Sequence, residues 1–265
     1  MVWPFPSRRR EGPRPRDLVP AGFVDVHCHV LPGLDDGPRA EDETARMLDA
    51  FAALGYARVA ATPHWHHSGF ETPERAQVGR LVDALNAGRG QAGPELVAGA
   101  EIAFDDRFLA ALEADALPRL GAGRAYLLEL SAVPGSLPRG FEDAAFRLAA
   151  RGATLVIAHA ERIPDLRRET GALERLRRAG ALAQIDLTSL AGKHGRTAEE
   201  WAWRLVEGGE ADVVGSDAHG AGDMPLVARA LKALAELGPA VLARLAVSNP
   251  AALLDGAIER VVRDA

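Results

Sequence analysis

The sequence has little cysteine and lysine, and it has no long apolar run. Its 265 residues include one cysteine, Cys28, which excludes a disulfide framework and a multi-cysteine zinc ribbon. No stretch of about 18 apolar residues occurs, so we expect no membrane-spanning helix. The net charge of −6 argues against a general nucleic-acid-binding protein. Hydrophobic residues make up 48% of the chain, which is enough for a buried core. We expect a cytoplasmic protein.

The first 20 residues differ in composition from the rest of the chain. They carry five arginines among five prolines, and no apolar region follows, so we expect neither a secretory nor a twin-arginine signal. We expect residues 1–20 to form a disordered basic arm; weak attraction to an anionic lipid or an acidic partner is the alternative. No linker divides residues 21–265, which are expected to form a single domain.

From residue 23 onward, short β-rich runs alternate with stretches of helical spacing. The expected strands are Phe23–His29, Ala57–Thr62, Leu96–Glu101, Ala125–Leu130, Thr154–His159, Leu182–Leu187 and Asp212–Ser216. The expected helices lie near 41–54, 72–88, 105–115, 139–151, 166–179, 197–208 and 224–236, with two more toward the C-terminus. Thr72 and Pro73 predict the start of the second helix, and Gly55 predicts the end of the first.

This alternation predicts an α/β protein with a parallel sheet covered by helices. Apolar strands that are separated by helices are typical of parallel sheets. Seven strand–helix units in about 240 residues suit a closed barrel better than an open sheet. An open doubly wound sheet is the alternative, although no glycine-rich phosphate loop follows the first strand.

Polar side chains that can bind metals follow six of the seven expected strands. They are His27, His29, Asp36, His64, Glu101, Glu129, His159, Asp217 and His219. The carboxyl ends of the strands share one face of a parallel barrel, so we expect these side chains to meet there. Without cations the carboxylates would repel one another, and nine ligands suffice for two or three divalent ions. Mixed imidazole and carboxylate ligands suit zinc, manganese or iron. His66, His67 and His194 lie away from the strand ends, and we expect them at the surface or the rim.

The pair His27 and Cys28 resembles the start of the phosphate loop in cysteine-dependent tyrosine phosphatases. That loop needs an arginine six residues after the cysteine, and Leu34 occupies the position. Without the arginine nothing holds the phosphate or lowers the pKa of the thiol. Side chains alternate along a strand, so Cys28 is expected to point away from both neighbouring histidines and to be a small buried core residue.

Together these residues resemble the PHP metallohydrolase family from about Phe23 to Ile258. Within that family they resemble the bacterial tyrosine-protein phosphatases of the CpsB/CapC type. The resemblance is carried by Asp25-Val26-His27-Cys28-His29, Asp35-Asp36-Gly37-Pro38, Phe70-Glu71-Thr72-Pro73-Glu74, Gly99-Ala100-Glu101-Ile102, Ala158-His159-Ala160-Glu161-Arg162 and Ser216-Asp217-Ala218-His219.

The resemblance implies a distorted (β/α)7 TIM-like barrel of the PHP type with a trinuclear metal centre. It implies manganese as the first choice of metal, with iron or zinc as alternatives. The implied reaction is the hydrolysis of phosphotyrosine on a protein partner. That partner would be the tyrosine-rich tail of a cognate bacterial tyrosine kinase that controls capsule or exopolysaccharide synthesis.

The resemblance also implies roles for individual residues. The first ion would be held by His27, His29, Glu101 and Asp217, the second by Glu101, Glu129 and His159, and the third by Asp36, His64 and His219. Asp36 is preferred to Asp35 because the family's ligand directly precedes the glycine. Arg162 would bind the substrate phosphate, and His64 would assist catalysis. The family usually has a second phosphate-binding arginine where this chain has Met224. This leaves Arg139 or Arg229 as replacements, or a different substrate preference.

Three other interpretations stay open. The same metals could serve a small phosphomonoester such as histidinol phosphate. An amidohydrolase also begins with His-x-His, but it usually has a carboxylated lysine after the fourth strand, where this chain has Glu129. A non-catalytic metal-binding scaffold would be expected to have lost ligands, and none is lost here.

Overall fold

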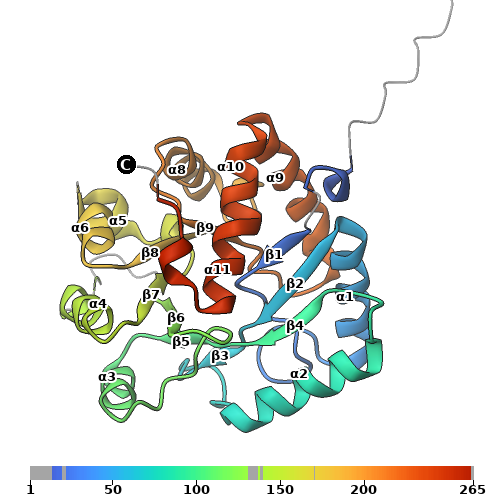
Figure 1. Ribbon diagram of the computed structural model, residues 1–265, viewed down its shortest axis with the longest axis horizontal. Coiled ribbons are helices and arrows are strands. Elements are labelled where there is room, and N and C mark those ends of the chain that lie inside the picture. The colour runs from blue at the N-terminus through green and yellow to red at the C-terminus, as the bar shows by residue number, and fades with distance from the viewer. Residues whose placement is uncertain (1–13, 20–21, 131–136, 138–139, 170, 264–265) are drawn as a thin grey trace, which may run out of the picture.

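The computed structural model describes residues 14–19, 22–130, 137, 140–169 and 171–263, in which parallel strands curl inside a layer of helices (Figure 1). The strands are β1 (Phe23–Asp25), β2 (Tyr56–Ala61), β3 (His64–Trp65), β4 (Glu95–Ala98), β5 (Glu101–Ala103), β6 (Ala125–Glu129), β7 (Thr154–Ile157), β8 (Leu182–Asp186) and β9 (Val213–Gly215). The α-helices are α1 (Glu41–Leu54), α2 (Arg75–Arg89), α3 (Asp106–Glu113), α4 (Phe141–Ala150), α5 (Pro164–Arg168), α6 (Ala172–Arg178), α7 (Leu187–Leu190), α8 (Arg196–Glu207), α9 (Met224–Glu236), α10 (Pro239–Ala243) and α11 (Asn249–Asp255). Shorter helical turns are η1 (Pro15–Asp17), η2 (Ala160–Arg162), η3 (Ala221–Asp223), η4 (Arg244–Ser248) and η5 (Ile258–Arg260).

Every strand pair in the described residues is parallel. One sheet has the order β1-β2-β4, and the other has the order β3-β5-β6-β7-β8-β9. Only two residues separate β2 from β3 and β4 from β5, so the chain passes directly from one sheet to the other at both places. The segment after β9 returns to the first strand through a parallel bridge between Cys28 and Ala218. The two sheets therefore enclose a common interior.

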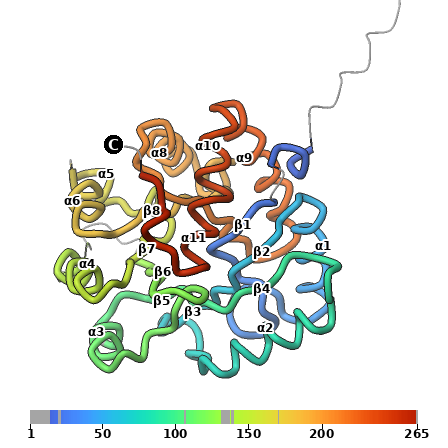
Figure 2. Tube along the Cα trace, viewed as in Figure 1, coloured from blue at the N-terminus to red at the C-terminus, as the bar shows by residue number. Residues whose placement is uncertain are grey.

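That interior is apolar at one end. Side chains of β6, β7, β8 and β9 alternate between this interior and the layer of helices, as the two-residue repeat of a strand requires. The interior cluster consists of Val24, Val26, Ala60, Leu120, Ala125, Leu127, Val156, Ala158, Leu182, Val213, Leu253 and Leu254. Its last two members belong to α11, which lies across the strands in the trace (Figure 2). The C-terminal helix therefore closes one end of the curled sheets and leaves the other end for polar side chains.

The expected α/β architecture is confirmed, and the differences from the sequence-based expectations are local. Helices α1 and α9 have the expected bounds, whereas the expected helix 166–179 is divided into α5 and α6 by Gly171, which has a φ of 78°. The sixth expected strand ends at Asp186, and Leu187 begins α7. The predicted start of α2 at Thr72 is wrong. The Thr72 hydroxyl accepts a hydrogen bond from the His66 N–H (3.2 Å), and Glu74 is the N-cap of a helix that begins at Arg75.

The folded part begins before the expected boundary at residue 20. Residues 15–17 form the turn η1, Pro15 is buried, and Val19 belongs to the larger hydrophobic cluster around the sheets. The expected basic arm thus overlaps a packed segment at residues 14–19, and its residues 1–13 lie outside the described part of the chain. Among the described residues, no helix combines the length and the apolar character that a membrane crossing needs.

Gly55 provides a test of how the N-terminal segment packs. It ends α1 in a left-handed conformation with a φ of 91°, and a Cβ at this position would lie 2.7 Å from the Cα of Arg16. We expect Gly55→Ala to lower the free energy of unfolding by more than about 1 kcal/mol, because both the backbone and η1 must shift. Gly79, inside α2 with nothing within 4 Å of such a Cβ, is the matched control. Gly79→Ala should stabilise by about 0.5–1 kcal/mol. Urea unfolding measures both, and a Gly55→Ala variant as stable as the wild type would contradict this packing.

Candidate active site

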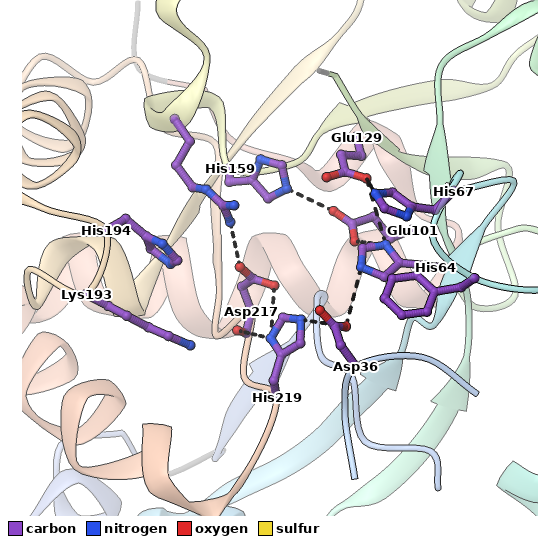
Figure 3. Close-up of a pocket in the computed structure, with 12 residues that line it drawn as sticks. Asp36, His64, His67, Glu101, Glu129, His159, Lys193, His194, Asp217 and His219 are labelled. Atoms are coloured by element: carbon purple, nitrogen blue, oxygen red, sulfur yellow. Dashed lines mark hydrogen bonds and ion pairs between the residues drawn. The ribbon is translucent and has the colours of Figure 1, made fainter. Parts of the chain in front are cut away.

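The polar end of the curled sheets forms a cavity of about 500 Å³ (Figure 3). It is lined by Asp36, His64, His67, Phe70, Glu101, Glu129, His159, Arg162, Lys193, His194, Asp217 and His219. The lining includes seven of the nine expected ligands, and the other two, His27 and His29, are buried against them. The tertiary structure therefore brings all nine together, although they are spread over almost 200 residues of the chain.

Glu101 is the centre of this cluster. Its carboxylate is buried, and four imidazoles approach it. Oε1 lies 2.9 Å from His159 Nε2 and 3.3 Å from His27 Nε2. Oε2 lies 3.0 Å from His64 Nδ1 and 3.3 Å from His29 Nε2. A carboxylate with ring nitrogens on both oxygens has the geometry of a ligand that bridges two cations.

Three of the histidines have one ring nitrogen fixed by a neighbouring acceptor. His27 Nδ1 donates to Gln184 Oε1 (3.1 Å), His29 Nδ1 to Asp35 Oδ2 (2.7 Å) and His219 Nδ1 to the carbonyl of Asp217 (3.0 Å). When such a ring is neutral, this contact leaves the lone pair on Nε2. The Nε2 atoms of His27 and His29 lie 3.4 Å apart and face the same Asp217 Oδ1, at 3.5 and 3.6 Å. Metal-binding histidines are commonly oriented in this way, so the donors fit divalent ions.

The adjacent carboxylates Asp35 and Asp36 are separated by the fold into different environments. Asp35 is largely buried and accepts hydrogen bonds from His29 Nδ1 and from the backbone N–H groups of Gly37 and His64. Asp36 is about half exposed, and its Oδ1 lies 3.2 Å from His219 Nε2 and 3.6 Å from His64 Nε2. Asp36 thus faces the cavity as expected, while Asp35 orients His29 from behind.

Groups of side chains that could each hold one ion occur at four places in the described residues. In each group one ligand atom per residue lies within 4.8 Å of all the others. The groups are His27, His29 and Asp217; His29, Asp36, His64 and His219; His64, Glu101 and Glu129; and Asp186, His194 and Asp217. The first three overlap with the three expected ligand sets, but the first lacks Glu101 and the second also contains His29. In the third of them His64 takes the place that the sequence analysis gave to His159.

The carboxylates strongly perturb the imidazoles around them. Burial alone would lower the pKa of His27, but Glu101 and Asp217 outweigh it and raise that pKa to about 10. Burial would also lower the pKa of His29, whose hydrogen bonds with Asp35 and Glu101 instead hold it well above its usual value. Conversely, burial would raise the pKa of Asp217, but His27 and His29 lower it. In the metal-free protein, imidazolium groups therefore supply the positive charge that the carboxylates need.

Two of the candidate ligands have left-handed backbone conformations. His159 follows β7 with a φ of 34°, and Asp217 follows β9 with a φ of 48°. Residues other than glycine adopt such angles at a cost of about 1–3 kcal/mol, and strain of this kind concentrates at functional sites. Here the sharp turn after each strand directs the side chain back into the cavity.

Arg162 lies in η2, directly after His159, and faces the same cluster. Its Nη1 donates to Asp217 Oδ2 (2.8 Å) and lies 3.4 Å from Asp186 Oδ2. Burial would lower the pKa of Arg162, but Asp186 and Asp217 outweigh it and raise that pKa further. The guanidinium is thus held in place by two carboxylates at the wall of the cavity.

The remaining histidines differ in their placement, whereas the cysteine is buried as expected. His67 and His194 are half-buried and line the cavity, while His66 lies outside its lining. Cys28 is fully buried within the hydrophobic cluster between sheets and helices, and burial raises the pKa of its thiol well above the usual value. A thiol of this kind is a poor nucleophile.

Gln184 and Asp186 contribute to the site and were missed by the sequence analysis. Gln184 Oε1 accepts hydrogen bonds from His27 and from the His159 N–H (2.9 Å), and its Nε2 donates to Asp186 Oδ1 (2.9 Å). Both are fully buried at the end of β8. The signal was present, because both lie within Leu182–Leu187, the one expected strand to which no ligand was assigned.

Comparison with known proteins identifies relatives of this chain. A family model described as capsular polysaccharide synthesis, CpsB/CapC, matches residues 23–255. The chain is 32% identical over 199 residues to the tyrosine-protein phosphatase YwqE of Bacillus subtilis (strain 168), covering 74% of this chain and 77% of YwqE. It is 26% identical over 209 residues to the tyrosine-protein phosphatase CpsB of Streptococcus pneumoniae, covering 77% of this chain and 85% of CpsB.

A solved structure agrees with these relatives. It comes from the crystal structures of YwqE from Bacillus subtilis and CpsB from Streptococcus pneumoniae, described as unique metal-dependent tyrosine phosphatases. The match has a TM-score of 0.79 at 29% sequence identity, and it covers 91% of this chain and 97% of the other. The fold described here is therefore shared with those proteins over nearly the full length of both chains.

The contact between Asp35 and His29 provides a test of ligand orientation. We expect Asp35→Asn to lower the metal affinity by about 10- to 100-fold, because His29 loses the acceptor that fixes its ring. The metal content of the purified variant, measured by elemental analysis, reports the effect. Asp36→Asn is the comparison, since Asp36 faces the cavity directly. If Asp35→Asn bound metal as tightly as the wild type, Asp35 would not orient His29.

The raised pKa of His27 predicts how the stability of the metal-free protein depends on pH. Between the usual value of 6.5 and about 10, the folded protein holds a proton that the unfolded chain has released. The free energy of unfolding should therefore fall as the pH rises through this range. Thermal unfolding in the presence of a chelator would show the decline. Manganese should reduce it, because a bound cation replaces the imidazolium charge. A chelated protein of constant stability up to pH 10 would contradict the charge balance described here.

Proposed function

Since the chain belongs to the CpsB/CapC capsular polysaccharide synthesis family, we propose that it is a metal-dependent protein-tyrosine phosphatase. The observation that carries the proposal is the convergence of imidazole Nε2 atoms and carboxylate oxygens around Glu101, next to a guanidinium. The carboxylates and imidazoles suit cations, and the guanidinium suits a phosphoryl group. The two together suit a metal-dependent phosphoric monoester hydrolase.

The metal centre in this proposal uses the nine expected ligands. They are His27, His29, Asp36, His64, Glu101, Glu129, His159, Asp217 and His219. The groups of three or four ligand atoms within 4.8 Å support two or three ions. Glu101 belongs to one of these groups, and its Oε1 faces His27 and His159, so it could also serve a second ion. The mixed imidazole and carboxylate donors support manganese, with iron or zinc as alternatives. Such ions supply Lewis acidity, which activates water for attack on phosphorus and neutralises phosphoryl oxygens.

Arg162 and His64 have separate tasks in the reaction. The Arg162 guanidinium, held by Asp217 and Asp186, donates to the non-bridging phosphoryl oxygens and stabilises the charge that develops on them. His64 is a buried residue of the cavity lining, and it would assist the departure of the phenolate. The leaving group needs little protonation, because the pKa of a tyrosine phenol is about 10.

An aromatic wall supports an aryl phosphate as the substrate. Phe70 lines the cavity and stacks on His64, with ring centroids 5.1 Å apart and an interplanar angle of 5°. His67 lies 5.2 Å from the Phe70 ring. A phenyl ring entering the cavity would meet apolar faces on this side. The substrate that we propose is phosphotyrosine on the tail of a cognate bacterial tyrosine kinase that controls capsule or exopolysaccharide synthesis.

The strand pairing supports a distorted (β/α)7 barrel of the PHP type. If β2 with β3 and β4 with β5 are each one interrupted strand, seven strands remain in the described part of the chain. The contact of Cys28 with Ala218 closes the ring between the first strand and the last. We propose that this barrel and its helices form one domain.

Phosphotyrosine hydrolysis with and without a chelator tests the proposed function. We expect EDTA to abolish the activity and manganese to restore it, because the cluster around Glu101 then regains its cations. Release of phosphate from a phosphotyrosine peptide is the measurement. Activity that resists a chelator would contradict the metal mechanism. Faster turnover of histidinol phosphate than of the peptide would favour the small-substrate alternative.

Arg162 provides a second test. We expect Arg162→Ala to lower kcat/KM for the phosphotyrosine peptide by about 100-fold, because a charge-assisted donor to the transition state is lost. Arg196→Ala is the control, since Arg196 is exposed on α8 and pairs only with Glu200 among the contacts of the described residues. The phosphate role of Arg162 is excluded if both variants keep the wild-type activity.

A further inference from the structure

Lys193 lines the cavity on the side opposite Glu129 and His67 (Figure 3). It is one of only two lysines in the chain, the other being Lys232 on α9. The loop that carries it is fixed by its backbone. The Lys193 N–H donates to the Thr188 carbonyl (3.0 Å), and the Arg229 guanidinium donates to the Ala191 carbonyl. The position of Lys193 beside the cavity is therefore set by the fold.

The ammonium group of Lys193 is held toward the active site. Its Nζ lies 2.8 Å from Asp223 Oδ1, and the other oxygen of that carboxylate accepts a hydrogen bond from the His219 N–H (3.0 Å). Asp223 thus joins Lys193 to the loop that carries a candidate metal ligand. The Lys193 side chain is 29% exposed, and in the close-up it extends toward Asp217 and His219 (Figure 3).

Two residues in the described lining carry a permanent positive charge, and each of them is paired with a carboxylate. Arg162 and Lys193 are the only arginine or lysine residues that line the cavity there, and Arg162 already contacts Asp217 and Asp186. Met224, where the sequence resemblance implies an arginine, is buried. Of the two replacements considered for that arginine, Arg229 contacts the Ala191 backbone, and Arg139 lies outside the described residues.

We propose that Lys193 is a second phosphate-binding residue, which donates from Nζ to a phosphoryl oxygen of the substrate. This assignment rests on the proposed phosphatase function. An ammonium group has three donors, so Lys193 can bind the phosphoryl group while one donor stays on Asp223. The charge implied at position 224 is thereby supplied from the loop after α7 instead.

Chemical modification tests the contact without relying on turnover. The metal-loaded protein is treated with acetic anhydride, with and without inorganic phosphate at constant ionic strength, and acetylation is measured by peptide mass spectrometry. We expect phosphate to slow the acetylation of Lys193 several-fold and to leave that of Lys232 unchanged, because Lys232 is exposed on α9. Equal acetylation of Lys193 with and without phosphate would overturn the proposal.

Kinetics of matched variants test the same contact in the reaction. We expect Lys193→Met to lower kcat/KM at least about tenfold for both p-nitrophenyl phosphate and a phosphotyrosine peptide, the effect of one charge-assisted hydrogen bond. Lys193→Arg should recover part of the loss, and Lys232→Met should match the wild type. Thermal unfolding and metal content of each variant show whether fold and metal centre are intact.

The outcomes separate this proposal from the function on which it rests. If Lys193→Met lowered kcat/KM for the phosphotyrosine peptide but not for p-nitrophenyl phosphate, Lys193 would contact the polypeptide part of the substrate. That result would overturn its phosphate role. An intact Lys193→Met variant with wild-type kinetics on both substrates would overturn it too. A wild-type protein that hydrolyses neither substrate would contradict the phosphatase function, whereas protection of Lys193 by inorganic phosphate would still show the binding site.

Discussion

The buried carboxylate of Glu101 is the group on which the rest of the site depends. Imidazoles from β3 and from the segments after β1 and β7 approach its two oxygens at 2.9–3.3 Å. A buried carboxylate without such partners costs several kcal/mol. The fold must therefore either keep several imidazoles protonated or hold cations in their place. The raised pKa of His27 shows that an imidazole can stay protonated here. The arrangement of the ligand atoms also suits bound cations.

The fold separates an apolar end from a polar end along the same strands. Leu182 and Val213 point into the interior cluster that α11 covers. Further along the same segments, Gln184 contacts His27 and Asp217 lines the cavity. The apolar end gives rigidity, because close-packed interiors resist deformation. That rigidity allows left-handed residues such as His159 to persist at the polar end. The close packing of the apolar end therefore compensates for the backbone strain at the polar end of the sheets.

Around the ligands, a second set of residues determines their orientation. Asp35, Gln184 and the Asp217 carbonyl each fix an Nδ1 atom, so that Nε2 faces the cavity. Asp186 and Asp223 hold the side chains of Arg162 and Lys193, respectively, through ion pairs. None of these five contacts adds a ligand to the proposed ions. They determine which atoms of the histidines, Arg162 and Lys193 face the site. The positions of these atoms must be held to within a fraction of an ångström.

The sequence by itself determined the alternation of strands and helices, the nine candidate ligands and the inert character of Cys28. These depend on local patterns: apolar runs, polar residues at strand ends and the two-residue alternation of a strand. Only the tertiary structure decided that Asp35 and Asp36 have different environments, that Gln184 and Asp186 support the site, and that Lys193 lines the cavity while Met224 is buried. These depend on contacts between residues far apart in the chain, which one-dimensional spacing does not encode. The loop with Lys193 lies beside the candidate ligands because the sheets curl and bring the segment after β9 next to the segment after β1.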